Sequence, residues 1–355
     1  MPIGDHTLLL SLEGALLAFG FNREGQLGLG HNNQQLTPAM VPWKGPQPVQ
    51  VDWGCSHSLV LDAEGSVWQA GSSRFSASPL TFEQVPGVPP MTLVAAGNTH
   101  SVALDTEGGL WAWTCKEDLS WARSLPQRVE GLPPLLKVAC GEDFLVAETE
   151  EGLWVLGENS SGQLGLGHTN SASGPTCVQV KDLSEGPLRC LVALNDGVMI
   201  VDSQGGVFSS GYNSDGQLGR SIGDDKKLQR IKNIPPMLGV SCGFDHTLAL
   251  DESGGVWTWG HGYSGQLGTG NTSSQHQPAL VPSLKGMSAL LASGNHSLAF
   301  PQEGGLLVFG SNIYGELGLN DLTNQHTPTP TLCPVQPALP HSVTSFSRKK
   351  SARFV

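Results

Sequence analysis

The sequence is poor in charge, and in positive charge above all. Only 14% of the 355 residues are charged, and 31 Asp and Glu outnumber 19 Lys and Arg, for a formal net charge of −12. Binding to a nucleic-acid backbone needs a basic face, so direct binding to DNA is not expected. The charge balance instead suits a basic protein partner.

Motifs that carry chemistry are also missing. The 7 Cys include no Cys-x-x-Cys pair, no His-x-x-x-His spacing occurs, and there is no P-loop. No cofactor and no metal are therefore expected. No residue stands out as a nucleophile or a general base, so a non-enzymatic role is favoured and an enzymatic one stays open.

Signals for export and for membrane insertion are absent as well. The sequence shows no secretory segment and no apolar run of 18 residues, so no membrane association is expected. An odd, scattered set of cysteines fits a reducing compartment. The expected location is the cytoplasm, the nucleus or both.

What the sequence has in abundance is glycine, 46 residues, and much of it recurs in a repeat. The repeat pairs a first position, most often His, with two downstream positions, most often Gly. Its members are His6, Gly14, Gly20; His57, Gly65, Gly71; His100, Gly108, Thr114; Phe144, Gly152, Gly157; Val198, Gly206, Gly211; His246, Gly254, Gly260; and His296, Gly304, Gly310. The first position recurs after 51, 43, 44, 54, 48 and 50 residues, a period typical of solenoids, propellers and arrays.

Each repeat predicts a small antiparallel sheet. In residues 238–260, short apolar runs end at glycines, and a Gly-Gly pair marks a tight turn between two of them. Such a sheet cannot bury both faces alone, whereas a closed ring of sheets can, and it also protects the strand edges. The sequence therefore predicts an all-β ring of blades.

Several recurring positions are interpreted as structural. The repeat histidines are expected to pin loops through backbone hydrogen bonds; they are His6, His57, His100, His246 and His296. A large apolar residue before the closing glycine is expected to pack between blades, and includes Trp68, Trp111, Trp154 and Trp257. The later Gly-Gln-Leu-Gly phrase is expected to plug each blade with its Leu.

These residues resemble the regulator of chromosome condensation repeat family. Cys242-Gly243-Phe244-Asp245-His246-Thr247, Trp257-Thr258-Trp259-Gly260 and Gly265-Gln266-Leu267-Gly268 carry the resemblance, which extends over residues 3–335. It implies a seven-bladed β-propeller of four-stranded antiparallel blades in a single domain, residues 1–347.

The N-terminus begins within a repeat, because no strand precedes His6. Residues 341–347 are expected to supply the missing strand, so that pairing of the N- and C-terminal segments closes the ring. Residues 348–355 form a short basic segment, interpreted as a disordered tail or as a nuclear-import or docking motif.

Acidic residues precede the repeat strand in neighbouring blades. Glu142, Asp143, Asp196 and Asp245 occupy this loop, and alternate connections of a blade share one face, so an acidic patch near the ring mouth is predicted. The resemblance implies contact with a small GTPase at Asp143 and Asp245. The alternative is that small polar residues simply fit tight turns.

A second candidate surface lies where blades two and three depart from the pattern. Arg74 and Phe75, and Trp121 and Arg123, replace the Gly-Gln-Leu-Gly phrase. Aromatic residues beside arginines are typical of interface hot spots. Phe75 and Trp121 could equally fill the space left by the missing Leu.

Three functional hypotheses follow. The first is a monomeric, non-enzymatic propeller that binds a protein through one loop-rich, partly acidic face. The second, implied by the resemblance, is a guanine-nucleotide exchange factor for a small, Ran-like GTPase, although the 43- and 44-residue intervals leave no room for the family's β-wedge in blades two and three. The third is a chromatin-associated regulator that binds histones.

Overall fold

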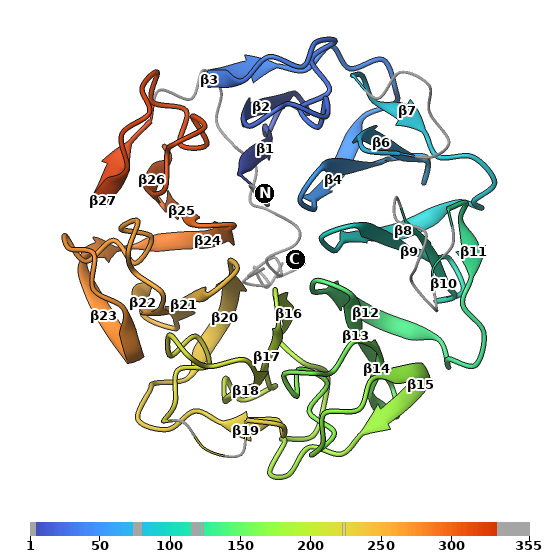
Figure 1. Ribbon diagram of the computed structural model, residues 1–355, viewed down its shortest axis with the longest axis vertical. Coiled ribbons are helices and arrows are strands. Elements are labelled where there is room, and N and C mark those ends of the chain that lie inside the picture. Colours follow the sequence, from blue (N-terminus) through green and yellow to red (C-terminus); the bar gives the residue numbers. More distant parts are fainter. Residues whose placement is uncertain are drawn as a thin grey trace, which may run out of the picture.

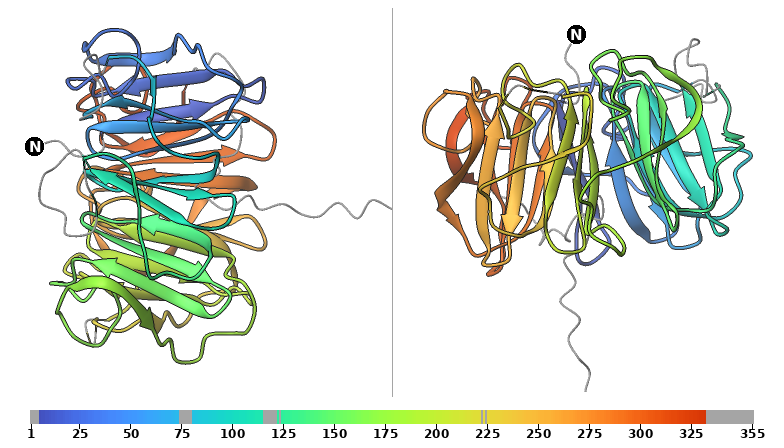
Figure 2. Two further views of the ribbon diagram at one scale, coloured as in Figure 1. Left: turned by 90° about the vertical axis from the view of Figure 1, so that its right-hand side faces the viewer. Right: turned by 90° about the horizontal axis from the view of Figure 1, so that it is seen from below.

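The computed structural model is a ring of seven antiparallel sheets around a central axis, as the sequence predicts (Figure 1). The structure describes residues 5–73, 80–114, 122, 124–221, 223 and 225–331, and this part of the chain contains strands and no helix. In side view the strands of each blade run roughly parallel to the axis, so the connections gather on two opposite faces (Figure 2).

The first four blades follow one another in sequence order. Blade 1 contains β1 (His6–Leu10), β2 (Leu16–Gly20) and β3 (Gln35–Met40). Blade 2 contains β4 (Pro48–Trp53), β5 (His57–Asp62), β6 (Val67–Gly71) and β7 (Glu83–Gln84). Blade 3 contains β8 (Met91–Ala96), β9 (His100–Asp105), β10 (Leu110–Thr114) and β11 (Gln127–Arg128). Blade 4 contains β12 (Leu135–Cys140), β13 (Phe144–Thr149), β14 (Gly152–Gly157) and β15 (Ala172–Val178).

The remaining blades repeat the pattern, with the first strand nearest the axis and the last at the rim (Figure 1). Blade 5 contains β16 (Cys190–Leu194), β17 (Gly197–Val201), β18 (Val207–Gly211) and β19 (Gln229–Arg230). Blade 6 contains β20 (Met237–Cys242), β21 (His246–Asp251), β22 (Gly255–Gly260) and β23 (Gln275–Lys285). Blade 7 contains β24 (Met287–Ser293), β25 (His296–Pro301), β26 (Leu307–Gly310) and β27 (Gln325–Pro330).

Blade 1 differs because its described residues form three strands. His6 pairs with Gly20 as His57 pairs with Gly71 in blade 2, so β1 is the counterpart of the second strand elsewhere. No described residue fills the innermost position of blade 1. The segment 341–347, expected to fill it, and the tail 348–355 lie outside the described residues.

The first position of the fifth repeat lies one residue earlier than predicted from the sequence. Gly197 pairs with Gly211, as His246 pairs with Gly260 in the next blade. The counterpart of the repeat histidine is therefore Gly197 and not Val198. With Gly205 in place of Gly206, the fifth set recovers the same spacing as the sixth.

The apolar core lies between the blades. Each of the seven junctions contains its own cluster of buried side chains, and the junction that closes the ring joins Leu9 and Phe19 of blade 1 to Leu298 of blade 7. The Leu plugs are confirmed, because Leu27, Leu164, Leu218, Leu267 and Leu317 are fully buried. Burial between blades explains why single blades would not fold alone.

The Gly-x-x-His pattern has a steric cause. A Cβ on Gly243 would lie 2.3 Å from the imidazole of His246, and Gly54 and Gly97 face His57 and His100 in the same way. Only glycine leaves room for the ring to fold back against the preceding loop.

These histidines were expected to form hydrogen bonds with backbone groups, and this expectation is wrong for four of them. Their Nε2 atoms lie 2.9 Å from hydroxyl oxygens on the neighbouring blade, in the pairs His6–Ser58, His57–Ser101, His246–Ser297 and His296–Thr7. The histidines therefore join one blade to the next rather than pin their own loop.

Three of the four repeat tryptophans pack between blades as predicted, and these three also hold a hairpin. Trp68, Trp111 and Trp257 contact the inter-blade clusters. The Trp257 indole N–H donates a hydrogen bond of 2.9 Å to Asp251, whose other carboxylate oxygen accepts the backbone N–H groups of Ser253 and Gly255. Trp68 and Trp111 donate to Asp62 and Asp105 in the same way. Trp154 has no such partner among the described residues.

Candidate interaction face

Two sets of loops share one face of the ring, as predicted. The residue after each of six third strands donates its backbone N–H to the loop residue before the second strand of the same blade. These pairs are Phe21–Asp5, Ser72–Ser56, Glu158–Asp143, Tyr212–Asp196, His261–Asp245 and Ser311–Asn295, at 2.7–3.1 Å. We call this surface the loop face.

Loops of neighbouring blades are also joined around the mouth of the ring. Asn98 donates its backbone N–H to Gly141, Glu142 donates to Asn195, and Phe244 donates to Gly294. These bonds join blade 3 to 4, blade 4 to 5 and blade 6 to 7, and they hold the loops of those neighbouring blades together on the loop face.

A polar cluster at blades 3 to 5 brings together three of the predicted acidic residues. The Asn195 side-chain amide donates to Glu142 at 3.1 Å and to Asp196 at 2.9 Å, and its oxygen accepts the amide of Asn98 at 2.7 Å. Asp143 lies beside them, 3.5 Å from the Thr99 hydroxyl.

The acidic side chains of this cluster interact electrostatically. Burial raises the pKa of Asp196 above its usual range, and the charges of Glu158 and Asp143 raise it further, against the hydrogen bond from Asn195. Like charges gathered with little cationic compensation make a site that gains from an approaching cation.

Asp245 extends the negative charge to blade 6. Burial raises its pKa, the Gln217 amide donates to it at 2.8 Å, and the charges of Asp215 and Asp196 oppose its ionisation. The electrostatic coupling between Asp245 and Asp196 links blades 5 and 6 in one acidic patch.

A second acidic pair lies at the junction of blades 7 and 1. Burial raises the pKa of Asp5 to about 7, and the charge of Glu316 contributes to the shift. Negative charge therefore occurs on both sides of the mouth.

Exposed apolar side chains flank the acidic patch, and the sequence reading missed them. Tyr263 is 67% exposed, Ile313 53% and Tyr212 46%, and all three adjoin the Asn-x-x-Gly-Gln-Leu-Gly phrase that was interpreted as purely structural. Tyr263 stacks edge-on against His261 with ring centroids 4.6 Å apart. In the sequence, these three residues could have been recognised as large side chains at positions where the repeat does not require them. Arg74, Phe75, Trp121 and Arg123 lie outside the described residues.

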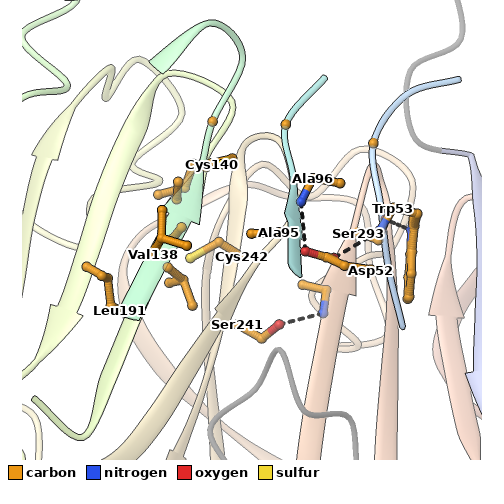
Figure 3. A pocket seen from close by; sticks show the side chains of 18 of the residues that line it. Asp52, Trp53, Ala95, Ala96, Val138, Cys140, Leu191, Ser241, Cys242 and Ser293 are labelled. Atoms are coloured by element: carbon orange, nitrogen blue, oxygen red, sulfur yellow. Dashed lines mark hydrogen bonds between the residues drawn. The ribbon is translucent and has the colours of Figure 1, made fainter. Parts of the chain in front are cut away.

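The mouth opens into a cavity of about 510 Å³ along the axis of the ring. It is lined by the innermost strands β4, β8, β12, β16, β20 and β24, and Figure 3 shows Asp52, Cys140, Cys242, Ser241 and Ser293 around it. Cys140 and Cys242, which line it, are partly buried. The described residues contain no group of three or more His, Cys, Asp or Glu that could hold a metal ion.

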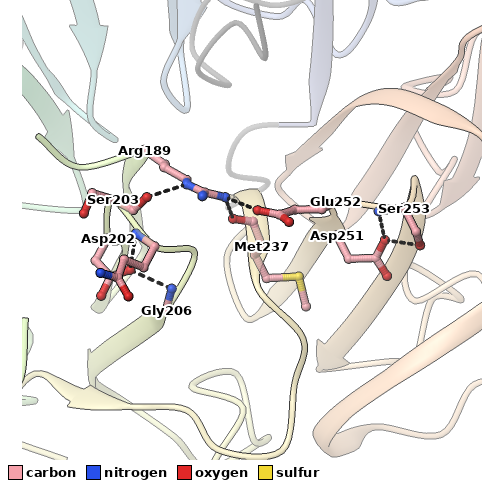
Figure 4. A network of polar contacts seen from close by, with 9 residues as sticks. Arg189, Asp202, Ser203, Gly206, Met237, Asp251, Glu252 and Ser253 are labelled. Carbon is pink, nitrogen blue, oxygen red and sulfur yellow. Dashed lines mark hydrogen bonds and ion pairs between the residues drawn. The ribbon is translucent and has the colours of Figure 1, made fainter. Parts of the chain in front are cut away.

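The opposite face carries a different kind of network (Figure 4). Arg189 donates to the backbone carbonyls of Ser203 at 3.0 Å and Met237 at 3.1 Å, and pairs with Glu252 at 2.8 Å. These contacts join blades 5 and 6 and engage the Arg189 guanidinium. Among the described residues, no helix is long and apolar enough to cross a membrane.

Comparisons with known proteins agree with this architecture. Residues 74–352 match the model of the RCC1-like domain, and residues 13–61 match that of the regulator of chromosome condensation (RCC1) repeat. The human E3 ubiquitin-protein ligase HERC2 is 26% identical over 279 residues, which cover 69% of this chain and 6% of HERC2.

Solved structures show the same fold. Prp20p from Saccharomyces cerevisiae, crystallised in a study of its binding to Gsp1p and histones, superposes with a TM-score of 0.81 at 20% identity, over 92% of this chain and 88% of Prp20p. Human WBSCR16 gives a TM-score of 0.80 at 21% identity, over 92% and 99% of the two chains. Since the RCC1-like domain model covers most of the sequence and the structure has its seven blades, the chain belongs to the RCC1-like domain family.

Proposed function

We propose that this propeller is a non-enzymatic interaction module that binds a basic protein through its loop face. The observation that supports the proposal most is the acidic patch of Glu142, Asp143, Asp196 and Asp245, held by hydrogen-bonded loops. Carboxylates steer and hold Lys and Arg side chains. Tyr212, Tyr263 and Ile313 supply apolar contact area beside them.

A histone is the partner class that best fits this chemistry. Prp20p, which shares the fold, was studied for its binding to histones, and the net charge of −12 suits a cationic partner. Such a partner places the protein in the nucleus, or in the cytoplasm where histones are first made.

The test is a titration of fluorescently labelled histone tail peptides, followed by anisotropy. The variant Asp143→Asn/Asp196→Asn/Asp245→Asn is expected to bind at least tenfold more weakly. Its matched control is Glu64→Gln/Glu107→Gln/Glu151→Gln, which removes the same charge from exposed turns on the opposite face and should bind normally. Equal weakening in both variants would show that net charge acts without a defined face.

Nucleotide exchange on a small GTPase is the second candidate. The resemblance implies contacts at Asp143 and Asp245, and both residues adjoin the mouth on the loop face. The test is release of labelled GDP from a panel of small GTPases. Acceleration of GDP release by orders of magnitude that is lost in Asp143→Asn/Asp196→Asn/Asp245→Asn, the loop-face variant, supports exchange. Unchanged release across the panel contradicts it.

A further inference from the structure

The central cavity contains a single carboxylate among its described lining residues, that of Asp52 on β4. The corresponding positions on the other innermost strands, by strand register, are uncharged: Ala95, Ala139, Val192, Ser241 and Leu291. A charge at this one position is therefore not a requirement of the repeat.

The hydrogen bonds that Asp52 makes do not require a charged side chain. One oxygen of Asp52 accepts the backbone N–H of Ala96 at 3.0 Å, and the other accepts the N–H of Trp53 at 2.9 Å. At the equivalent position Ser241 accepts the N–H of Ala292 at 2.9 Å with a neutral hydroxyl. Each carboxylate oxygen of Asp52 also keeps a further lone pair for a donor.

The two cations of the cavity are engaged elsewhere. Lys137 on β12 pairs with Glu148 and donates to the carbonyl of Leu188 at 2.7 Å. Arg189 is held by Ser203, Met237 and Glu252 on the opposite face (Figure 4). Among the described residues, Asp52 therefore has no cationic partner.

We propose that the channel is a subsite for a lysine or arginine side chain, with Asp52 as its counter-ion. The inference rests on the proposed function, because the side chain would come from the basic partner on the loop face. Ser241 lines the same cavity, and its hydroxyl oxygen, which accepts the N–H of Ala292, can accept a second N–H from the bound side chain (Figure 3). A buried carboxylate paired with a cation is strongly favoured over an unpaired one.

The route to Asp52 is already acidic and polar. Asn98 and Asn195 belong both to the cavity wall and to the hydrogen-bonded cluster with Glu142 and Asp196. A cation drawn to the loop face would therefore meet the channel mouth, and Asp52 is the carboxylate among the described residues that line the cavity beyond it.

Binding in the channel should depend on pH. Burial raises the pKa of Asp52 to about 7, and a cation favours its ionised form, so affinity should rise from pH 6 to pH 8. The titratable and charged groups that line the cavity with Asp52 are Lys137, Cys140, Arg189 and Cys242, and His6 and His57 lie on β1 and β5, which pack against β4. Burial raises the pKa of both thiols and lowers that of both imidazoles to about 3 and 4, which leaves Asp52 as the group that shifts towards neutral pH.

The test uses n-butylammonium as the probe and the Trp53 indole N–H signal in a ¹⁵N spectrum as the reporter, because this indole bonds to Ser293 in the cavity wall at 2.9 Å. n-Butanol is the uncharged control. Wild type should show a saturable shift with the cation alone, stronger at pH 8 than at pH 6. Asp52→Asn keeps an acceptor for Ala96 and should weaken binding at least tenfold. If Asp52→Asn does not fold, Asp52→Ser, which copies Ser241, carries the same comparison.

The same experiment separates the sources of the cation. Equal binding to the full chain and to residues 1–347 assigns the site to a partner's side chain, whereas binding seen only after removal of residues 348–355 assigns it to the protein's own basic tail. An equal shift with n-butanol, or undiminished binding in the Asp52 variants, would overturn the inference. Histone-peptide binding that is lost in the loop-face variant but normal in Asp52→Asn would overturn it and leave the proposed function standing, while normal binding in both would overturn both.

Discussion

Nε2 of His296 lies 2.9 Å from Oγ1 of Thr7, and this contact joins the last blade to the first. The Thr7 hydroxyl donates its own hydrogen to the carbonyl of Glu316 at 2.9 Å, so the imidazole must donate from Nε2. The ring is therefore closed by the same histidine–hydroxyl contact that joins consecutive blades.

Loss of that hydroxyl should weaken the closed ring. Thr7→Val keeps the shape but leaves the buried Nε2–H of His296 without an acceptor, and should lower the free energy of unfolding by about 1–3 kcal/mol. Urea denaturation measures the change. The control Thr323→Val, on an exposed loop, should stay within about 0.5 kcal/mol of wild type, and an equal loss in both would contradict the role given to His296.

The buried histidines should make the protein sensitive to acid. Burial lowers the pKa of His6, His246 and His296 to about 3 and that of His57 to about 4. A depressed imidazole pKa contributes stability above the unfolded value of about 6.5, and this is lost as pH falls towards the folded value.

Two buried carboxyls act in the opposite sense. Burial raises the pKa of Asp5 and Asp52 to about 7, so their contribution is present below about 4 and is lost as pH rises towards 7. Four imidazoles oppose these two carboxyls and the smaller upward pKa shifts of Asp196, Asp245 and Glu316, and the unfolding free energy should fall between pH 6.5 and pH 4.5. Urea midpoints across this range measure it, and a midpoint that rises on acidification would be incompatible with neutral, buried histidines.

Substitution by Phe should reduce stability by different amounts at two tryptophans that occupy the same repeat position. Trp257→Phe removes the indole N–H that Asp251 accepts and should cost about 1 kcal/mol more than Trp154→Phe. The Trp154 N–H is buried without a described partner, so its loss removes no bond. Thermal melts of both variants check the difference, and equal costs would show that only ring volume matters.

The C-terminal segment should be needed for the fold. The innermost position of blade 1 is filled by no described residue, and we propose that residues 341–347 supply that strand. Deletion of residues 336–355 should cause unfolding or aggregation, whereas deletion of residues 348–355 should leave the melting temperature unchanged. An unchanged melting temperature after the longer deletion would rule out this closure.

Much of the fold was predictable because the repeat fixes backbone geometry locally. The spacing of glycines, the buried Leu after each Gly-Gln pair and the large residue before the closing glycine each determine a position within one blade. Contacts between blades were not predictable in this way. The pairing of His57 with Ser101 depends on how two sheets stack. The shift from Val198 to Gly197 is established by strand pairing, although the spacing to Gly205 and Gly211 already indicated it.

The candidate site was predictable in part for the same reason. Strand alternation placed Asp143, Asp196 and Asp245 on one face, and backbone contacts confirm that these loops adjoin. Exposure of Tyr212 and Tyr263 was not evident because the repeat marks their neighbours as structural. Asp52 was missed because its role depends on the cavity that six blades enclose.

The most direct measurement is hydrogen–deuterium exchange of the chain with and without bound core histones. Binding through the loop face predicts slower exchange in residues 141–143, 195–196, 211–217, 243–245 and 261–266, with the hairpin turns around Glu64, Glu107 and Glu151 unchanged. Protection confined to those turns, or to the outer strands, would contradict the account.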